Sequence, residues 1–207
     1  MEVFVTFLLN LIYISATLAL IALGLAMVFG LLGVMNMAHG EFVMLGAYSV
    51  YVVQLAGQHF LWAIPVAIVI CVMVGWLMEW LVVRHLYSRP FDTLLATWGV
   101  AILIRKGVEV IFTRDYKSVN QVMPGTIDLL GVSYPAYRLL LVALIIVLFV
   151  ALFTWYQKSK AGLKIRAMVQ GPELAAAVGI DTARLSRLTF IIGVSTAGLA
   201  GVLLAPL

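Results

Sequence analysis

Apolar runs of about twenty residues or more, separated by short polar connections, dominate the sequence. A helix of about 20 apolar residues crosses the hydrocarbon core of a bilayer, so most of these runs are long enough to span it. Lipid offers no partners to the backbone, which leaves helices or closed barrels, and barrel strands are shorter and alternate in polarity. The sequence therefore predicts an all-α, polytopic membrane protein with about six to seven membrane segments, in one transmembrane domain over residues 1–207.

The composition favours the same class and excludes several functions. Hydrophobic residues make up 64% of the chain and charged residues 11%, whereas a soluble domain is only about half apolar. The net charge of +4 gathers in the connections, which indicates membrane topology rather than a nucleic-acid surface. The sequence contains no phosphate-binding G-x-x-x-x-G-K-[ST] loop and no clustered catalytic set. We therefore expect a protein that is not an enzyme and holds no cofactor or metal, with the single Cys71 serving packing.

The segment 157–187 is the longest polar stretch, and it lies between two apolar spans. Because basic connections stay on the cytoplasmic side, we expect this segment to face the cytoplasm. A basic loop of this kind often does no more than bind anionic lipid headgroups, and composition alone leaves that alternative open. Its basic residues are Lys158, Lys160, Lys164, Arg166, Arg184 and Arg187.

Within this segment the pattern predicts two short helices, at 163–169 and 173–178. Pro172 suits the first position of the second helix, Glu173 favours its first turn, and Gly179 ends it. The second helix also carries a small apolar face at i, i+3 and i+4 spacing, which the groove of another protein could cover. That face consists of Leu174, Ala177 and Val178.

Polar residues interrupt the hydrophobic half of the chain at 36–41. Asn36 and His39 would share one face of a helix, Gly40 offers a break, and Glu41 adds a carboxylate. Such groups are costly in a bilayer unless they meet a partner, a cavity or the interface. Three interpretations remain open: a structural knot that fixes a broken helix, a polar patch along a substrate pathway, and a proton relay or metal site.

Charge also sets the expected topology of the remaining connections. The basic connection 84–90 is expected inside, and 113–135 is expected outside as a folded loop because it holds turn residues and charges of both signs. The direction of the N-terminus stays open. Arg105 and Glu109 in the span between these connections could pair on one face or extend to the outer headgroups.

The last apolar span has small residues at every fourth position, which is typical of a close contact between helices. These residues are Gly193, Ala197, Gly201 and Ala205.

Two blocks of motifs resemble the permeases of branched-chain amino acid and urea type ABC importers. The first block runs through Gly24–Tyr48 and includes the Asn-Met-Ala-His-Gly-Glu motif at 36–41. The second runs through Gly162–Ala205 and includes Glu-Leu-Ala-Ala at 173–176 and Gly-Ile at 179–180.

The resemblance implies a multi-pass permease in the bacterial cytoplasmic (inner) membrane. The expected partners are a second homologous permease, ATP-binding subunits at the cytoplasmic face, and a periplasmic or extracellular substrate-binding protein. The last-span ladder would then pack on another helix of the chain, on the second permease, or on both. The residues expected to couple the permease to the ATP-binding subunit are Gly162, Arg166, Pro172, Glu173, Leu174, Ala177 and Gly179.

The stretches 89–99 and 120–124 resemble the urea-type members more closely, so the first expectation is import of urea or short amides. The alternatives are a branched-chain amino acid permease and a stand-alone channel for urea or another small solute, with 36–41 lining its path. Members of the resembled family continue with further helices, so we also expect a chain truncated at its C-terminus.

Overall fold

The computed structural model describes residues 2–87, 89–129 and 131–207 and is almost entirely helical. The prediction of an all-α membrane protein is confirmed, apart from one small antiparallel hairpin that the sequence did not predict. The elements in chain order are α1 (Glu2–Leu32), α2 (His39–Leu55), η1 (Phe60–Trp62), α3 (Ala63–Leu81), η2 (Val83–His85), α4 (Pro90–Phe112), β1 (Thr126–Leu129), β2 (Val132–Pro135), α5 (Ala136–Lys158), α6 (Lys160–Gln170), α7 (Pro172–Ala177) and α8 (Thr182–Leu204).

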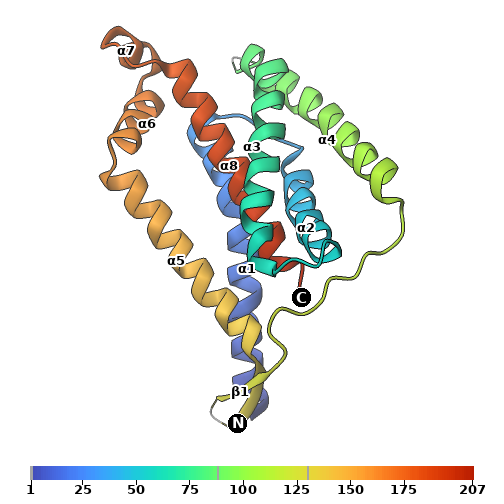
Figure 1. Cartoon of the computed structure of the whole chain (residues 1–207). Coiled ribbons are helices and arrows are strands. Elements are labelled where there is room, and N and C mark those ends of the chain that lie inside the picture. The colour runs from blue at the N-terminus through green and yellow to red at the C-terminus, as the bar shows by residue number, and fades with distance from the viewer. Residues whose placement is uncertain (1, 88, 130) are drawn as a thin grey trace.

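Six long helices, α1, α2, α3, α4, α5 and α8, run back and forth between two ends of the molecule (Figure 1). Among the described residues, four segments are long and apolar enough to cross a membrane: Glu2–Leu32, Phe60–His85, Ala136–Lys158 and Thr182–Leu204. The other two long helices differ for simple reasons, because α2 has only 17 residues and α4 carries four charged side chains.

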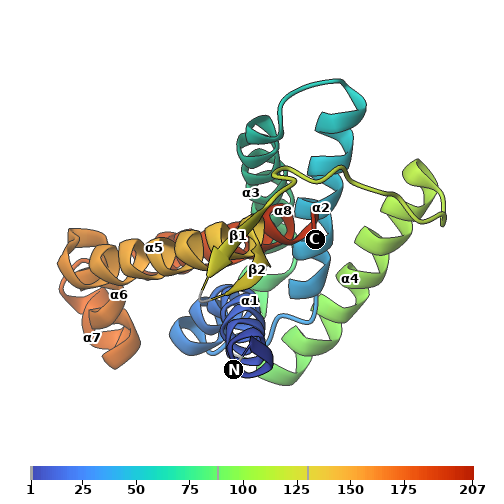
Figure 2. The same ribbon diagram turned by 90° about the horizontal axis from the view of Figure 1, so that it is seen from below.

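Helix α8 lies at the centre of the bundle and packs against α1, α2 and α3 (Figures 1 and 2). The predicted ladder of small residues forms this contact. A Cβ added at Gly193 would lie 2.5 Å from a Val28 methyl group, and one added at Gly201 would lie 1.9 Å from the Val43 carbonyl oxygen. The backbones of α8 and α2 therefore approach as closely as only glycine permits, and within the described residues the ladder serves an internal contact.

The main apolar core lies where α1, α2, α3 and α8 meet. It contains Phe42, Phe190, Val194 and Cys71, all fully buried. The Cys71 thiol also lies 3.9 Å from the Phe42 carbonyl oxygen, so the expected packing role of this cysteine is confirmed.

The first apolar run forms one continuous helix of 31 residues, and the break comes earlier than the sequence suggested. At the helical rise, α1 is about 46 Å long, which exceeds the hydrocarbon thickness and requires tilting or protrusion. The chain turns at Gly33, whose φ is +66°, and α2 starts at His39. The expected break at Gly40 is therefore wrong, since Gly40 lies inside α2, and Asn36 lies in the turn rather than on a shared helical face.

The arrangement of the connections agrees with the predicted topology. Helices α6 and α7 lie at the same end of the molecule as the end of α3 and the start of α4, and the β1–β2 hairpin lies at the opposite end (Figure 1). The N-terminus lies with the hairpin, so α1 runs from that end to the other and α2 returns toward it. On the predicted topology, the segment 157–187 and η2 are cytoplasmic, and the hairpin and N-terminus are external.

Candidate coupling surface and polar network

Helix α6 folds back against the end of α5 through two residues that the sequence singled out. Gly162 leaves room for the backbone of α5, since a Cβ there would lie 2.0 Å from the Tyr156 carbonyl oxygen. Arg166 donates to the carbonyls of Tyr156 and Gln157, at 2.7 and 3.1 Å, and its guanidinium lies over the Tyr156 ring. These carbonyls belong to the last turn of α5, where helices favour a cation. Gly162 and Arg166 therefore hold α6 against α5, and they do not form the outer surface of the segment 157–187.

Helix α7 presents the predicted apolar face to the outside. Pro172 occupies its first turn as expected, and Gly179 follows with a φ of +84°, a conformation that favours glycine. Leu174 is 77% exposed and Val178 76% exposed, and Ala177 between them is exposed as well. Large apolar side chains this exposed beside a charged segment are typical of a protein contact.

The opposite side of α7 is anchored in a separate small core. Ala175 of α7 is buried together with Ile165 and Met168 of α6 and Leu185 of α8. The Asp181 carboxylate accepts from the Arg184 backbone N–H and so caps the start of α8. Helices α6 and α7 and the start of α8 therefore pack as one unit.

A buried ion pair joins that end of α8 to α3. The Arg187 Nε donates to a Glu79 carboxylate oxygen at 2.7 Å, and Glu79 is only 1% exposed. The Tyr87 hydroxyl donates to the other carboxylate oxygen at 3.4 Å. Burial, and next the charge of Glu79, raise the pKa of Tyr87 well above its ordinary value, so the hydroxyl keeps its proton.

Sequence reasoning missed this cluster. Glu79 and Arg187 are 108 positions apart, and Arg187 was counted only among the basic residues that set topology. The available signal was a carboxylate near the inner end of an apolar span, because such a group needs a partner.

The side chains of Asn36, His39 and Glu41 are all buried, and each has at least one protein partner, although the Asn36 Nδ2 and the His39 Nδ1 have none among the described residues. The Asn36 side-chain oxygen accepts from the Ala38 backbone N–H at 3.0 Å. The His39 Nε2 lies 3.0 Å from the Ile21 carbonyl oxygen of α1, and a Glu41 oxygen lies 2.5 Å from the Arg105 guanidinium of α4. The structure does not bring the three side chains to one site.

A second polar contact holds α4 against the same turn. Thr97 of α4 accepts from the Met37 backbone N–H at 3.0 Å and lies 3.3 Å from the Met35 carbonyl oxygen. Thr97 is fully buried. Contacts among α1, α2 and α4 therefore fix the turn between α1 and α2, which favours the structural interpretation of these polar residues. Among the described residues, no group of three or more His, Cys, Asp or Glu side chains could hold a metal.

Of the two alternatives for Arg105, pairing with Glu109 on one face is not what the structure shows. Arg105 reaches across to Glu41 on α2, and Glu109 accepts from Lys106 and Arg114 at 2.8 and 3.1 Å. Arg105 pairs with Glu41 because a buried carboxylate is costly without a cation beside it. Glu109 lies near the end of α4, where Lys106 and Arg114 are its partners.

The comparison with known families decides what kind of protein carries this arrangement. A family model described as "Branched-chain amino acid transport system / permease component" matches residues 7–207. The chain belongs to this permease family. The family resemblance drawn from the sequence is thereby confirmed, and the chain is a multi-pass permease of the inner membrane, a transport subunit rather than an enzyme.

Several relatives of this permease bear the same description. It is 29% identical over 212 residues to the high-affinity branched-chain amino acid transport system permease protein LivH of Escherichia coli K12, covering 94% of this chain and 68% of the relative. The LivH protein of Salmonella typhimurium is 28% identical with the same coverage. The permease protein BraD of Pseudomonas aeruginosa is 26% identical, covering 95% of this chain and 69% of the relative. No solved structure matches the permease.

Proposed function

We propose that this chain is the membrane-spanning subunit of an ABC importer for branched-chain amino acids, and that α7 is its contact with an ATP-binding subunit. The observation that carries the proposal is the exposed apolar face of α7 on a unit packed against α8. Helix α8 is the central helix of the bundle, so a displacement at α7 would be applied where most of the membrane helices meet.

The substrate class follows the relatives rather than the first expectation. The relatives described above are named for branched-chain amino acid transport, and import of urea or short amides stays a prediction. Thr93, in the stretch 89–99 that resembles urea-type permeases, has a structural role in this chain. The Thr93 hydroxyl is fully buried and donates to the carbonyls of Leu86 and Arg89, at 2.7 and 2.9 Å, so it fastens the start of α4. Helix α4 starts at Pro90, and no side chain caps its first turn.

The proposed partners follow from the function. An importer needs ATP-binding subunits, which would meet α7, and a substrate-binding protein, which would meet the external end that carries the β1–β2 hairpin. A second permease subunit would complete the pathway. Much of α4 that faces away from α2 is apolar and exposed in this chain, including Leu95, Leu103 and Val110, so this face is available to lipid or to that second subunit.

For residues 36–41 we propose the structural role. The contacts of Asn36, His39 and Glu41 with backbone and with Arg105 support a knot that fixes the α1–α2 turn. A substrate pathway would instead need polar atoms that converge on open space.

The coupling role can be tested by placing charges on the exposed face of α7. Leu174→Asp with Val178→Asp should reduce ATP-driven leucine uptake by at least about tenfold, because desolvating two carboxylates in an apolar groove costs more than the about 1.4 kcal/mol that a factor of ten represents. The matched control is Leu163→Asp, an exposed leucine on the neighbouring helix α6 that should leave uptake near normal. Both variants should reach the membrane at normal levels.

Co-purification separates coupling from other defects. The α7 variant should lose the ATP-binding subunit during purification, and the α6 control should retain it. Retained ATP-driven uptake in the α7 variant, with normal membrane levels, would refute the assignment of α7.

A further inference from the structure

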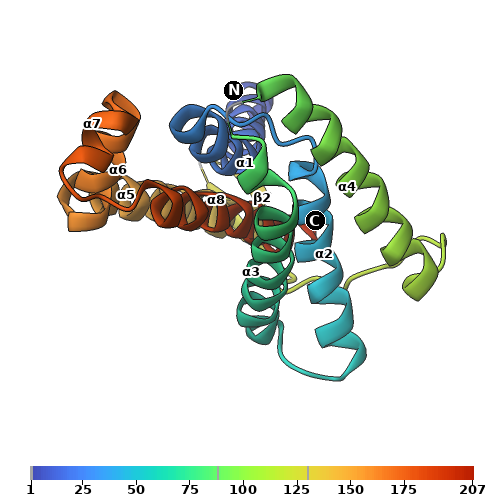
Figure 3. The same ribbon diagram turned by 90° about the horizontal axis from the view of Figure 1, so that it is seen from above.

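A cavity of about 310 Å³ opens between α2 and the segment that follows α4. Tyr48 and Tyr51 of α2 form one wall, and residues 114–119, which follow α4, form the other. Helix α4 runs along the outer side of α2, away from the centre of the bundle (Figures 2 and 3). The cavity is large enough for one small amino acid, and it lies at the end of the molecule expected to face outward.

Charges of both signs line the cavity wall that follows α4. The Lys117 ammonium lies 3.9 Å from an Asp115 carboxylate oxygen, a loose pair that is longer than a direct hydrogen bond. The Lys117 side chain is only 24% exposed, and its ammonium lies 6.0 Å from the centre of the Tyr51 ring. Arg114 lines the same cavity and pairs with Glu109. The Thr113 hydroxyl bridges the two side chains, since it donates to Asp115 at 2.6 Å and accepts from Lys117 at 3.4 Å. The two charges are not joined to each other by a direct hydrogen bond, so each can take a ligand group of opposite charge.

The opposite wall is apolar and aromatic. Tyr48 and Tyr51 line it. Both rings also pack against the Phe112 ring of α4, which is not part of the lining, at 4.9 and 6.1 Å between ring centres. Val119 and Ala205 add aliphatic surface to the cavity. An aromatic cluster of this kind binds a branched aliphatic side chain through apolar contact.

A charge pair also joins α2 and α4 elsewhere along the two helices. Glu41 of α2 pairs with Arg105 of α4, whose side chain is 60% exposed. A guanidinium that is exposed inside a span avoids lipid by facing water, headgroups or another subunit.

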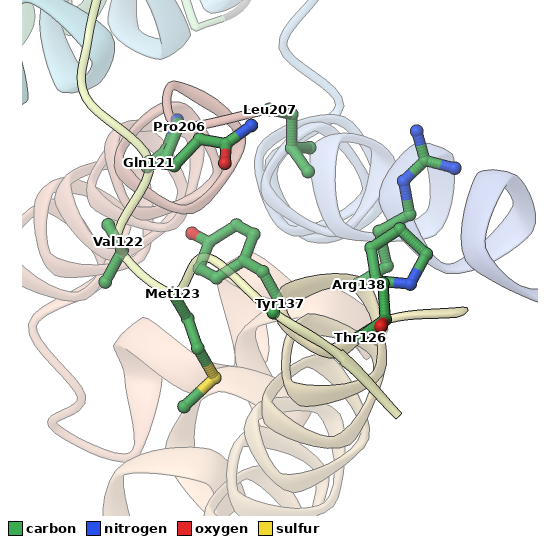
Figure 4. Close-up of a pocket in the computed structure, with 10 residues that line it drawn as sticks. Gln121, Val122, Met123, Thr126, Tyr137, Arg138, Pro206 and Leu207 are labelled. Atoms are coloured by element: carbon green, nitrogen blue, oxygen red, sulfur yellow. The ribbon is translucent and has the colours of Figure 1, made fainter. Parts of the chain in front are cut away.

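A second external cavity, near the end of the chain, lacks this combination. It has about 350 Å³ and lies where residues 121–126 approach the end of the chain (Figure 4). Its one cation, Arg138, extends away from it toward α1 (Figure 4), where it donates to Asn10 at 3.2 Å and lies over the Tyr13 ring. The Tyr137 hydroxyl is also engaged, since it donates to the Leu203 carbonyl at 2.8 Å.

We propose that the cavity between α2 and the 114–119 segment is an entry site that binds the substrate as a zwitterionic, branched aliphatic amino acid. Lys117 pairs with the α-carboxylate, Asp115 pairs with the α-ammonium, and the Tyr48–Tyr51 wall holds the aliphatic side chain. This inference rests on the proposed function and names the place where that substrate first meets the permease.

The charges give the site its selectivity. Charge-assisted hydrogen bonds are roughly twice as strong as neutral ones, and a zwitterion makes two of them at once. Urea is uncharged and has no aliphatic part, so it gains neither the two charge pairs nor the apolar contact. An amine or a carboxylic acid of the same shape gains one pair and leaves the other charge without its partner.

Protection of an introduced cysteine tests the site directly. The only native cysteine, Cys71, is fully buried, so a water-soluble maleimide has little background. Val119→Cys places a thiol in the cavity, in membrane vesicles that carry the complete transporter. Leucine at about nine times its Kd should slow labelling about tenfold, because only about a tenth of the sites then stay empty. Ile127→Cys on β1, exposed and outside the cavity, is the matched control and should label at the same rate with or without leucine.

Two further comparisons identify the ligand chemistry. Isocaproate, which lacks the ammonium, and isopentylamine, which lacks the carboxylate, should each protect less than leucine at equal concentration. Combining Val119→Cys with Asp115→Asn and Lys117→Gln should abolish protection by leucine.

The two proposals fail in different ways. If the transporter takes up leucine but leucine does not protect Val119→Cys, the entry site is refuted and the proposed function stands. If isocaproate or isopentylamine protects as well as leucine, recognition of a zwitterion is refuted. If the transporter takes up no branched-chain amino acid, the proposed function fails and the entry site fails with it.

Discussion

Removal of Arg187 should destabilise the permease, because this partly buried side chain is the cationic partner of a buried carboxylate. Glu79 is 1% exposed, and without Arg187 its carboxylate retains only the Tyr87 hydroxyl at 3.4 Å. Removing one partner of a buried pair costs about 3–5 kcal/mol because it strands the other charge. Since the Arg187 side chain is 36% exposed and water reaches it, we expect the lower end, about 3 kcal/mol, for Arg187→Met.

The double variant separates a stranded charge from lost packing. Glu79→Met together with Arg187→Met removes both charges, so it should cost less than Arg187→Met alone. Glu79→Gln keeps an oxygen that accepts from Arg187 and should cost about 1–2 kcal/mol.

Denaturant titration of each purified variant in detergent micelles measures these free energies of unfolding. The set forms a double-mutant cycle, and its interaction term should be favourable by more than about 1 kcal/mol. A cost below about 1 kcal/mol for Arg187→Met, or a double variant less stable than either single one, would refute the reasoning.

Two further substitutions test the packing of the helices. Gly201→Ala should destabilise the bundle and lower membrane levels by several-fold, because the new Cβ would meet the Val43 carbonyl oxygen, whereas Gly99→Ala, with open space around it, should be neutral or slightly stabilising. His39→Asn should cost about 1–3 kcal/mol in unfolding free energy through its lost bond to the Ile21 carbonyl, yet leave uptake per assembled transporter unchanged. Loss of uptake at normal stability and membrane level would instead favour a pathway role.

Local sequence signals predicted the short helices of the segment 157–187 well. Pro172 and Gly179 bound α7 because each has a backbone preference that acts without its neighbours. The face of Leu174 and Val178 was likewise set by helical spacing alone. The small-residue ladder of α8 was predicted for the same reason, since a backbone contact requires small side chains whichever helix is the partner.

Contacts between distant segments could not be predicted. Arg105 has a carboxylate at i+4 and another 64 positions away on α2, and only burial of Glu41 decides which one it meets. The helix break at Gly33 was missed because Gly33 lies within an unbroken apolar run, and its φ of +66° depends on how α1 and α2 pack on α8. The β1–β2 hairpin was recognised only as a folded loop, since its strands are four residues each.

Uptake of labelled leucine by cells that carry the complete transporter tests the central claim most directly. Unlabelled leucine, isoleucine and urea serve as competitors, and a transporter with an inactivated ATP-binding subunit serves as control. We predict uptake that the two amino acids compete and urea does not, and that stops when ATP hydrolysis is abolished. Competition by urea, or leucine flux that continues without ATP hydrolysis, would contradict the assignment of this chain as a branched-chain amino acid permease.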